Sequence, residues 1–226
     1  MRRVLRIGHR GAAGHAPENT LAAIEQGIAL GVDFVEVDLR RTADGVLVVL
    51  HDASVNRTTN GRGRIDRLSL REVKKLDAGN GECIPTLAEV LATVLGRCGL
   101  MLELKVEGTA RQVVETVQSA GFSGPVVYAS FLHDELTDVR AADPQAPLLA
   151  LFSRVPHASV ARATKYRATY AGLQHDIATG RLIDSFHHAG LLVWVYTVDK
   201  KGDIRRALSV GVDGVISNVP ERIVAG

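Results

Sequence analysis

The 226-residue chain has 27 Lys and Arg against 25 Asp and Glu, a formal net charge of +2, and 46% hydrophobic residues. A chain of this length can bury about 70% of its unfolded surface, enough for a sizeable core. The near-neutral charge and the lack of a long basic block argue against a nucleic-acid binder. No apolar run reaches the roughly 18 residues of a membrane span, which argues against an integral membrane segment.

The N-terminal residues Met1 to Arg3 are basic, but the apolar stretch after them is broken by Arg6 and is too short for a secretory h-region. We therefore expect a cytoplasmic protein. Cys83 and Cys98 are isolated and lack metal-type spacing, which favours reduced structural thiols. Aromatic residues make up only 4% of the chain, which argues against extended sugar or single-strand recognition.

Short apolar runs typical of strands alternate with helical patterns along the whole chain. Strands are predicted at residues 4–9, 33–39, 100–105, 126–130, 148–152, 169–173, 191–198 and 214–217. Helices are predicted at residues 20–30, 87–95, 109–120, 133–142, 159–165, 179–188 and 202–209. Eight strands, each followed by a helix or helical turn, predict an α/β fold: a closed (β/α)8 TIM barrel forming a single domain over residues 1–226. A doubly wound open sheet is the less favoured alternative.

Two acidic residues stand at positions i and i+2 of the second predicted strand. Because side chains alternate along a strand, Glu36 and Asp38 share one face. Two carboxylates on one face of an apolar strand need a cation nearby, and a divalent metal ion fits that need. The alternative is that both acids lie at an open strand end, where they are solvated or paired with Arg40 or Arg41.

A hairpin is predicted directly after this strand. Asp44 and Gly45 separate two apolar runs, which is a strong signal for a tight turn. If these are the two central turn residues, His51 lies opposite Asp38 on the same face. A shift of one residue would send His51 to the other face, so this expectation depends on the register.

The stretch from residue 52 to residue 85 is the one long departure from the strand and helix rhythm, and it is rich in turn formers between Arg57 and Gly63. A long loop in a compact domain is often functional or acts as a lid. The alternative is a surface turn followed by a short helix near residues 69–76.

Polar residues end several predicted strands, where barrel enzymes gather their functional groups. The carboxylates of Glu36, Asp38 and Glu103 predict an oxygen cage for a hard cation, Ca²⁺ or Mg²⁺ rather than zinc. Arg10 and Lys105 beside such an ion favour a phosphate group.

Two histidines complete this set. His9 ends the first strand and His51 follows the hairpin, so one can take a proton and the other can give one. Together with the cation cage and the basic pair, they indicate cleavage of a phosphate diester.

Short motifs at nearly every strand end extend this pattern along the chain. They are His-Arg-Gly at 9–11, Pro-Glu-Asn-Thr at 17–20, Glu-Val-Asp at 36–38, Thr-Ala-Asp-Gly at 42–45, His-Asp at 51–52, Arg-Thr-Thr-Asn-Gly at 57–61, Ile-Pro-Thr-Leu at 84–87, Glu-Leu-Lys at 103–105, Ser-Phe at 130–131 and Asp-Gly at 213–214. In these motifs the chain resembles the glycerophosphodiester phosphodiesterase family.

The resemblance implies a barrel fold with Ca²⁺ or Mg²⁺ on Glu36, Asp38 and Glu103. It implies acid and base roles for His9 and His51, and it also implies phosphate contacts from Arg10 and Lys105. The implied reaction is hydrolysis of a small-molecule glycerophosphodiester to an alcohol and sn-glycerol 3-phosphate, with a cyclic phosphate as a possible intermediate.

Several further residues are candidates for the pocket or for its support. Asn19 is expected to cap the helix that begins at Thr20, and Glu18 lies where it can support His9 or Arg10. Ser130 and Phe131 follow the fourth predicted strand of the barrel.

Two departures from the resemblance concern the part of the pocket beyond the phosphate. Where relatives usually carry Trp-Thr-Val-Asn, this chain has Tyr-Thr-Val-Asp at 196–199, and Trp194 lies two residues before Tyr196 on the same face. In addition, the segment after the hairpin is short beside relatives that carry an inserted subdomain. The head group is therefore left open.

Three other functions remain as alternatives. A lysophospholipase D would perform the same chemistry on a lipid-bearing diester. A barrel glycosidase could use Glu36 and a second carboxylate, although the scarce aromatics and the Arg, Lys and His set count against it. A non-catalytic phosphate-binding barrel would lack turnover, although no member of the catalytic set is missing.

Overall fold

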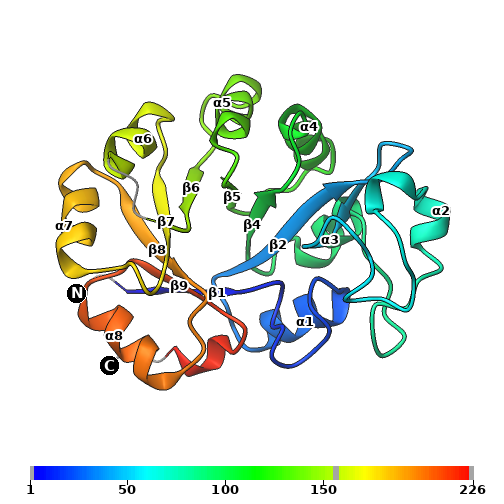
Figure 1. The fold of residues 1–226 in the computed structure, drawn as a ribbon, viewed down its shortest axis with the longest axis horizontal. Coiled ribbons are helices and arrows are strands. Elements are labelled where there is room, and N and C mark those ends of the chain that lie inside the picture. The colour runs from blue at the N-terminus through cyan, green and yellow to red at the C-terminus, as the bar shows by residue number, and fades with distance from the viewer. Residues whose placement is uncertain (1–2, 155–157, 224–226) are drawn as a thin grey trace.

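A computed structural model describes residues 3–154 and 158–223 of the chain, and in it parallel strands surrounded by helices form a closed barrel (Figure 1). The barrel strands are β1 (Leu5–Gly8), β2 (Phe34–Arg41), β4 (Gly99–Leu104), β5 (Val126–Ser130), β6 (Leu148–Phe152), β7 (Tyr170–Gln174), β8 (Leu192–Tyr196) and β9 (Gly214–Ser217). Each pairs with its neighbours in parallel, and β1 pairs with both β2 and β9, which closes the ring. The predicted TIM barrel is confirmed, and the open-sheet alternative is wrong.

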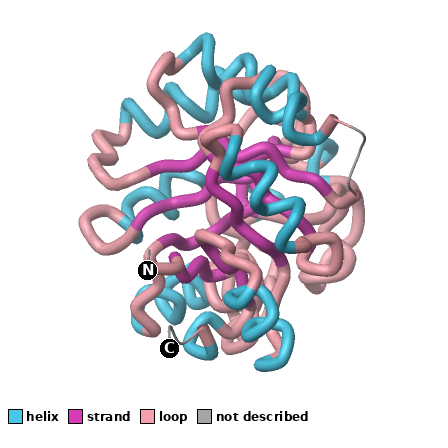
Figure 2. Tube along the Cα trace, turned by 90° about the vertical axis from the view of Figure 1, so that its left-hand side faces the viewer, coloured by secondary structure: helices cyan, strands magenta, loops and turns pink. Residues whose placement is uncertain are grey.

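Helices follow the strands and cover the outside of the barrel, so that in the side view of Figure 2 the strands lie in the middle. They are α1 (Leu21–Ala29), α3 (Leu87–Val94), α4 (Ala110–Ser119), α5 (His133–Ala142), α6 (Ser159–Lys165), α7 (Gly180–His188) and α8 (Lys201–Ser209). The short helix α2 (Leu70–Val73) and the 3₁₀ turn η1 (Ile65–Arg67) lie in the stretch between residues 52 and 85, and a second 3₁₀ turn, η2 (Pro220–Arg222), follows β9. Thr20, Thr86 and Thr179 each accept a hydrogen bond from a backbone N–H in the first turn of the helix that follows. Such caps satisfy N–H groups that the helix itself leaves free.

The alternation of side chains along the strands produces two apolar layers. The outward layer packs under the helices, and the inward layer fills the barrel itself with residues from all eight barrel strands. Within the barrel, Trp194 is completely buried and lies against Phe34 and Tyr170, with ring centroids 5.4 and 4.7 Å apart. The barrel is therefore a packed plug, and a site can be built only on its rim.

Strand β2 is longer than its neighbours and leaves the barrel at its carboxyl end. Its last residues pair in antiparallel fashion with β3 (Leu47–Val49), which confirms the hairpin extension. The predicted register is wrong by one residue, because Leu39 faces Val49 and Arg41 faces Leu47. The turn has three residues, with Gly45 at φ +84°, and this places Leu50 rather than His51 against Asp38.

The stretch from residue 52 to residue 85 is an ordered segment with a small core of its own. Its apolar side chains pack with two residues of the hairpin arm in one cluster: Val48, Leu50, Val55, Ile65, Val73, Ala78 and Ile84. The short helix expected near residues 69–76 is present as α2, where Ser69 and Glu72 form a capping box. We refer to residues 52–85 as the hairpin segment.

In the part of the chain that the structure describes, no helix is both long and apolar enough to cross a membrane.

Candidate active site

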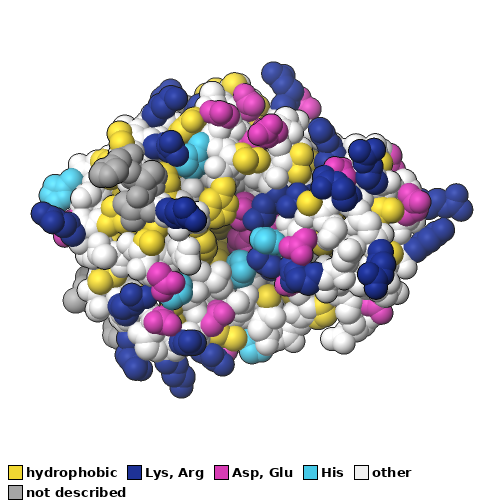
Figure 3. All heavy atoms as spheres, in the orientation of Figure 1, with side chains coloured by type: hydrophobic (Ala, Val, Ile, Leu, Met, Phe, Trp, Pro, Cys, Tyr) yellow, Lys and Arg dark blue, Asp and Glu magenta, His cyan; other side chains and the backbone are white. Residues whose placement is uncertain are grey.

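Three carboxylates meet at the rim of the barrel, and acidic, basic and histidine side chains gather in a hollow over its middle (Figure 3). Parallel pairing of β2 with β4 sets Asp38 directly beside Glu103, while Glu36 lies two residues before Asp38 on the same face. All three are buried, and each offers an oxygen atom within 4.8 Å of the others. The predicted clustering of Glu36, Asp38 and Glu103 is thus present in the structure.

The protonation of this carboxylate cluster reflects its burial. Burial raises the pKa of Glu36 well above its usual range, and the charges of Asp38 and Glu103 raise it further. Burial and Asp38 also raise the pKa of Glu103, to about 7, although Lys105 opposes the shift. One oxygen of Glu36, Oε1, is buried and accepts no hydrogen bond from the described residues. A buried oxygen without a partner is costly, and a bound cation would satisfy it.

Arg10 holds two of the carboxylates. Its backbone N–H donates to Glu36 Oε2 at 2.7 Å, and its guanidinium Nε lies 3.3 Å from Asp38 Oδ2. Its Nη1 donates to Glu18 Oε1 at 2.6 Å, so the expected support from Glu18 is present for Arg10. Burial would lower the pKa of Arg10, but Asp38, Glu36 and Glu18 raise it, and the guanidinium stays charged.

Lys105 lies on the other side of the cluster, directly after β4. Its Nζ is 2.5 Å from Glu103 Oε1 and 3.1 Å from Asp38 Oδ1. Burial would lower the pKa of Lys105, but these two carboxylates outweigh burial and raise it. Arg10 and Lys105 therefore present two fixed positive charges around the carboxylates, as the sequence predicted.

His9 is oriented by a chain of hydrogen bonds from the end of the barrel. Its Nδ1 lies 2.7 Å from Asn218 Oδ1, and Asn218 Nδ2 donates to Asp199 Oδ2 at 2.7 Å. Because a carboxylate only accepts hydrogen bonds, the amide nitrogen of Asn218 must face Asp199, and its oxygen must face His9. His9 Nδ1 is then the donor, and its Nε2 carries the lone pair. Burial and the charge of Arg10 lower the pKa of His9 to about 4.

His51 reaches the site by a different route from the predicted one. It follows β3 and lies beyond the paired part of the hairpin, where its backbone oxygen accepts a hydrogen bond from Arg40 Nε at 2.8 Å. Its Nδ1 lies 2.8 Å from Asp52 Oδ1. Burial lowers the pKa of His51, while Asp38 and Asp52 oppose the shift. The register prediction was wrong, yet the imidazole still lies within electrostatic range of Asp38.

Arg57 of the hairpin segment links the two sides of the site. It donates from Nη1 and Nη2 to both oxygens of Glu18, each at 2.8 Å, and from Nε to Asp52 Oδ2 at 2.8 Å. Glu18 holds Arg10, and Asp52 holds His51, so one guanidinium connects a phosphate-binding candidate with an acid–base candidate. Sequence reasoning placed Arg57 only within a motif and assigned it no role.

Asn19 has a different place from the one expected. The N-cap of α1 is Thr20, and the Asn19 amide instead donates from Nδ2 to Asp38 Oδ2 at 2.8 Å and accepts from Asp38 N at 3.3 Å. Asn19 has φ +59° and Arg10 has φ +52°, a region that residues other than glycine rarely adopt. Both residues hold Asp38, and such backbone strain is typical of functional sites.

Of the remaining pocket candidates, some lie at the rim of the barrel and others support it from below. Phe131 is exposed, lies 5.8 Å from the Lys105 ammonium and packs edge to face on Tyr196, whose hydroxyl donates to the Phe152 oxygen. Ser130 is fully buried, and its hydroxyl bonds the backbone of strand β4 and of Leu132, which makes it a support residue. Trp194 lies in the barrel plug below the rim, away from the hollow.

Sequence reasoning missed the orienting roles of these residues: Asn19, which was expected as a helix cap, Asp52, Arg57, Asp199 and Asn218. The signal for Asn19, Asp52 and Arg57 was present, because all three belong to the motifs that carry the family resemblance. No local pattern could have indicated Asn218, which is 209 positions away from His9.

The profile of the Glycerophosphoryl diester phosphodiesterase family matches residues 9–222 of the chain. The chain belongs to this family. A glycerophosphodiester phosphodiesterase of Caldanaerobacter subterraneus is 32% identical over 98% of this chain and 97% of its own length. One of Bacillus subtilis is also 32% identical, over 97% and 85% of the two chains. A phosphodiesterase of Oleispira antarctica, whose structure is in complex with the product sn-glycerol-3-phosphate, superposes with a TM-score of 0.91 at 30% identity, covering 96% and 94% of the two chains.

These relatives confirm the resemblance that the motifs indicated. The family assignment makes the chain an enzyme, a glycerophosphodiester phosphodiesterase among the phosphoric diester hydrolases. The glycosidase and the non-catalytic barrel are thereby excluded as descriptions of the whole chain.

Proposed function

We propose that Glu36, Asp38 and Glu103 bind one divalent cation, Mg²⁺ or Ca²⁺, and that His9 and His51 perform the proton transfers of diester hydrolysis. The observation that carries the proposal is the carboxylate cluster, three buried acids with oxygen atoms within 4.8 Å of one another. Its oxygen-only ligands suit a hard cation. When bound, such an ion supplies charge stabilisation at the phosphate and lowers the pKa of an oxygen nucleophile.

The different partners of the two imidazoles suggest their roles. His9 faces the neutral amide of Asn218, and its low pKa of about 4 keeps Nε2 free to accept a proton. Burial lowers the pKa of His51, but His51 faces the carboxylate of Asp52, a partner that opposes this shift and favours the protonated ring. We therefore assign His9 as the base that accepts the proton of the attacking hydroxyl, and His51 as the acid that protonates the leaving alkoxide.

Arg10 and Lys105 are the phosphate-binding groups in this proposal. They lie on opposite sides of Asp38 and reach it with nitrogen atoms at 3.3 and 3.1 Å. A phosphate held between them is bound by two positive charges and positioned against His9. The products are then an alcohol and sn-glycerol 3-phosphate, the ligand present in the Oleispira antarctica relative.

The wider setting of the reaction is part of the same proposal. We assign it to one domain over residues 1–226, acting in the cytoplasm on small-molecule diesters and not on nucleic acid. The family match over residues 9–222 supports the single domain, and the near-neutral net charge of +2 argues against nucleic acid.

The test is turnover of glycerophosphocholine and glycerophosphoethanolamine, measured as released glycerol phosphate, with and without chelator. We expect activity to stop in chelator and to return with Mg²⁺ or Ca²⁺. His9→Ala and His51→Ala should each lower kcat by about 10²- to 10⁴-fold, while His188→Ala on the outer face of α7 serves as the matched control. Robust turnover in excess chelator would remove the cation from the proposal, and an unchanged kcat in either variant would remove that histidine.

A further inference from the structure

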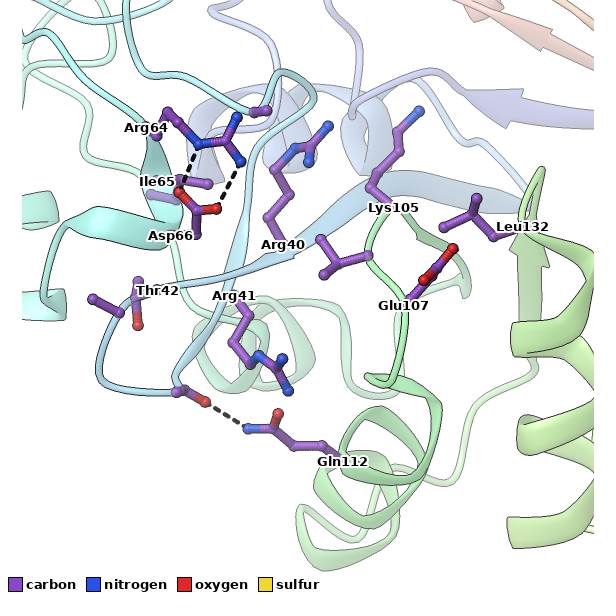
Figure 4. Close-up of a pocket in the computed structure, with 14 residues that line it drawn as sticks. Arg40, Arg41, Thr42, Arg64, Ile65, Asp66, Lys105, Glu107, Gln112 and Leu132 are labelled. Carbon is purple, nitrogen blue, oxygen red and sulfur yellow. Dashed lines mark hydrogen bonds and ion pairs between the residues drawn. The ribbon is translucent and has the colours of Figure 1, made fainter.

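A cavity with a volume of about 830 Å³ opens beside the carboxylate cluster. Lys105 belongs to both, because it lines this cavity and also contacts Asp38 and Glu103. Of the other charged lining residues, Arg40 and Arg41 come from the end of β2, Arg64 and Asp66 come from the hairpin segment, and Glu107 follows Lys105 after β4 (Figure 4). Three arginines, Arg40, Arg41 and Arg64, are among them.

The charges of this cavity do not cancel. Arg64 is paired with Asp66, at 2.6 Å between Nη2 and Oδ2, and the pair is drawn with its two dashed lines in Figure 4. Arg40 and Arg41 form no ion pair with any carboxylate among the described residues, and both bond backbone oxygens instead, Arg40 to His51 and Arg41 to Gly108. With Glu107 as the remaining acid of the lining, the cavity keeps an excess of positive charge.

The Arg40 and Lys105 side chains extend in the same direction in Figure 4, and Arg41 points the other way, toward Gln112. An anion that enters the cavity therefore meets positive charge on more than one side. A concave surface with an excess of positive charge concentrates a negatively charged ligand group. Val106, Ile65 and Leu132 contribute its apolar lining.

The chemistry of the substrate decides which part of it could lie here. The phosphate goes to the carboxylate cluster, and the glycerol half carries only uncharged hydroxyl groups. A negatively charged group next to the phosphate must then belong to the other alcohol. We infer that this cavity is a subsite for an anionic head group, so that the enzyme prefers glycerophosphodiesters whose leaving alcohol bears a phosphate or carboxylate.

This inference rests on the proposed function, which it refines by naming the substrate class. It is tested with a matched pair of diesters: glycerophosphoglycerol, whose head group is neutral, and the same diester with a phosphate monoester at the far end of its head group. Glycerophosphocholine, with a cationic head group, is the third substrate. We expect kcat/KM at low ionic strength to be about tenfold higher for the anionic diester than for the neutral one, and lowest for the choline ester.

Two exposed residues of one ion pair provide opposite changes of charge. Arg64→Gln removes a positive charge from the cavity, and Asp66→Asn removes a negative one, although each breaks the same pair. We expect the ratio of kcat/KM for the anionic over the neutral diester to fall about threefold in Arg64→Gln and in Arg41→Gln and to rise about threefold in Asp66→Asn. The control is Arg97→Gln, which breaks a similar surface pair with Glu25 and should leave the ratio unchanged.

Binding to the His9→Ala variant, measured by calorimetry, separates this inference from the proposed function. If neither diester is hydrolysed by the native enzyme but the anionic one still binds about tenfold more tightly, the proposed function fails and the subsite stands. Equal binding and equal kcat/KM for the two diesters would overturn the subsite. A fall of the ratio in both Arg64→Gln and Asp66→Asn would also overturn it, because the pair would then act only through structure.

Discussion

Arg57 connects the two sides of the site through its contacts with Glu18 and Asp52. Its side chain is about half exposed, yet it makes four hydrogen bonds to the carboxylates of Glu18 and Asp52. Because those carboxylates hold Arg10 and His51, the guanidinium links the two groups that we propose to act on one phosphate. Partners of this kind preorganise the groups that contact the substrate.

Replacement of Arg57 by Ala should lower kcat/KM by about 10- to 100-fold, the usual effect of removing an orienting partner. We expect most of the loss in kcat, because His51 and Arg10 lose their alignment while the carboxylate cluster is untouched. Steady-state kinetics with glycerophosphocholine, and the pH profile of kcat, are the measurements.

Arg62→Ala is the matched control, since Arg62 is an exposed arginine of the same segment. Arg57→Lys keeps the charge but cannot bind Glu18 with two parallel bonds, so it should recover only part of the activity. An Arg57→Ala enzyme with native kcat and an unshifted pH profile would show that the bridge is not needed for alignment.

At the scale of elements, the hairpin segment depends on its own small core. Ile84 is 2% exposed and packs with Val55, Ile65 and Val73, away from the barrel layers. The segment carries Asp52 and Arg57 to the site, so its packing and the alignment of His51 are coupled.

Ile84→Ala should therefore loosen the hairpin segment and lower kcat while the barrel stays folded. A buried Ile→Ala change costs about 2–5 kcal/mol, and we expect the cost to appear as faster hydrogen exchange within residues 52–85. Mass-spectrometric hydrogen exchange and kcat are measured on the same sample.

Ile183→Ala on α7 makes the same change in the outer barrel layer and is the comparison. It should lower the melting temperature but leave kcat at 25 °C and exchange in the hairpin segment unchanged. Loss of protection spread evenly over the barrel in Ile84→Ala would contradict the separate core.

The same elements show what the sequence can and cannot predict. Strand and helix periodicity, with polar residues at strand ends, was enough for the barrel and for the carboxylate cluster, because both follow from local pattern plus the closure of parallel strands. The hairpin register was wrong because Asp44 and Gly45 suit a three-residue turn as well as a two-residue one.

The position of Asn19 was wrong for a related reason. Asn and Thr are both good N-caps, so Asn19 and Thr20 compete on local grounds, and Thr20 has the role. Only the fold brings the Asn19 amide to Asp38. The partners of His9 and Arg57 likewise become neighbours only through tertiary structure.

For the whole molecule, the carboxylate cluster links stability to pH and to metal. In the metal-free protein the pKa of Glu103 is raised, by burial and then by Asp38, from about 4.5 to about 7, and the pKa of Glu36 is also raised. Between about pH 4.5 and the raised pKa values, the folded state then binds more protons than the unfolded state. The free energy of unfolding therefore falls as the pH rises through about pH 7. Burial lowers the pKa values of His9 and His51, so these two groups make the free energy of unfolding rise with pH. They do so only below about pH 6.5.

In chelator, the melting temperature should therefore be lower at pH 8 than at pH 6.5. Added Mg²⁺ or Ca²⁺ should raise it at pH 8, where the carboxylates are ionised and free to bind the ion. Differential scanning calorimetry at the two pH values, with and without metal, is the measurement.

Glu103→Gln removes one ionisable group from the cluster and should remove much of this pH dependence together with the response to metal. Asp184→Asn on α7 is a control carboxylate outside the site. A higher melting temperature at pH 8 than at pH 6.5 in chelator would contradict the assigned proton balance.

The carboxyl end of β2, which extends beyond the barrel, has a consequence for how such enzymes can diverge. Residues 34–39 of this strand pair with β4 in the barrel, whereas its last two residues, Arg40 and Arg41, pair only with β3. The hairpin segment, Arg64 and Asp66 included, follows that end and lies outside the strand pairing that holds Glu36 and Glu103, so we expect these carboxylates to keep their place when the segment is exchanged, provided that Asp52 and Arg57 are kept. A chimaera that receives the corresponding segment of a relative should acquire the donor's preference among leaving alcohols while it cleaves the same phosphorus–oxygen bond.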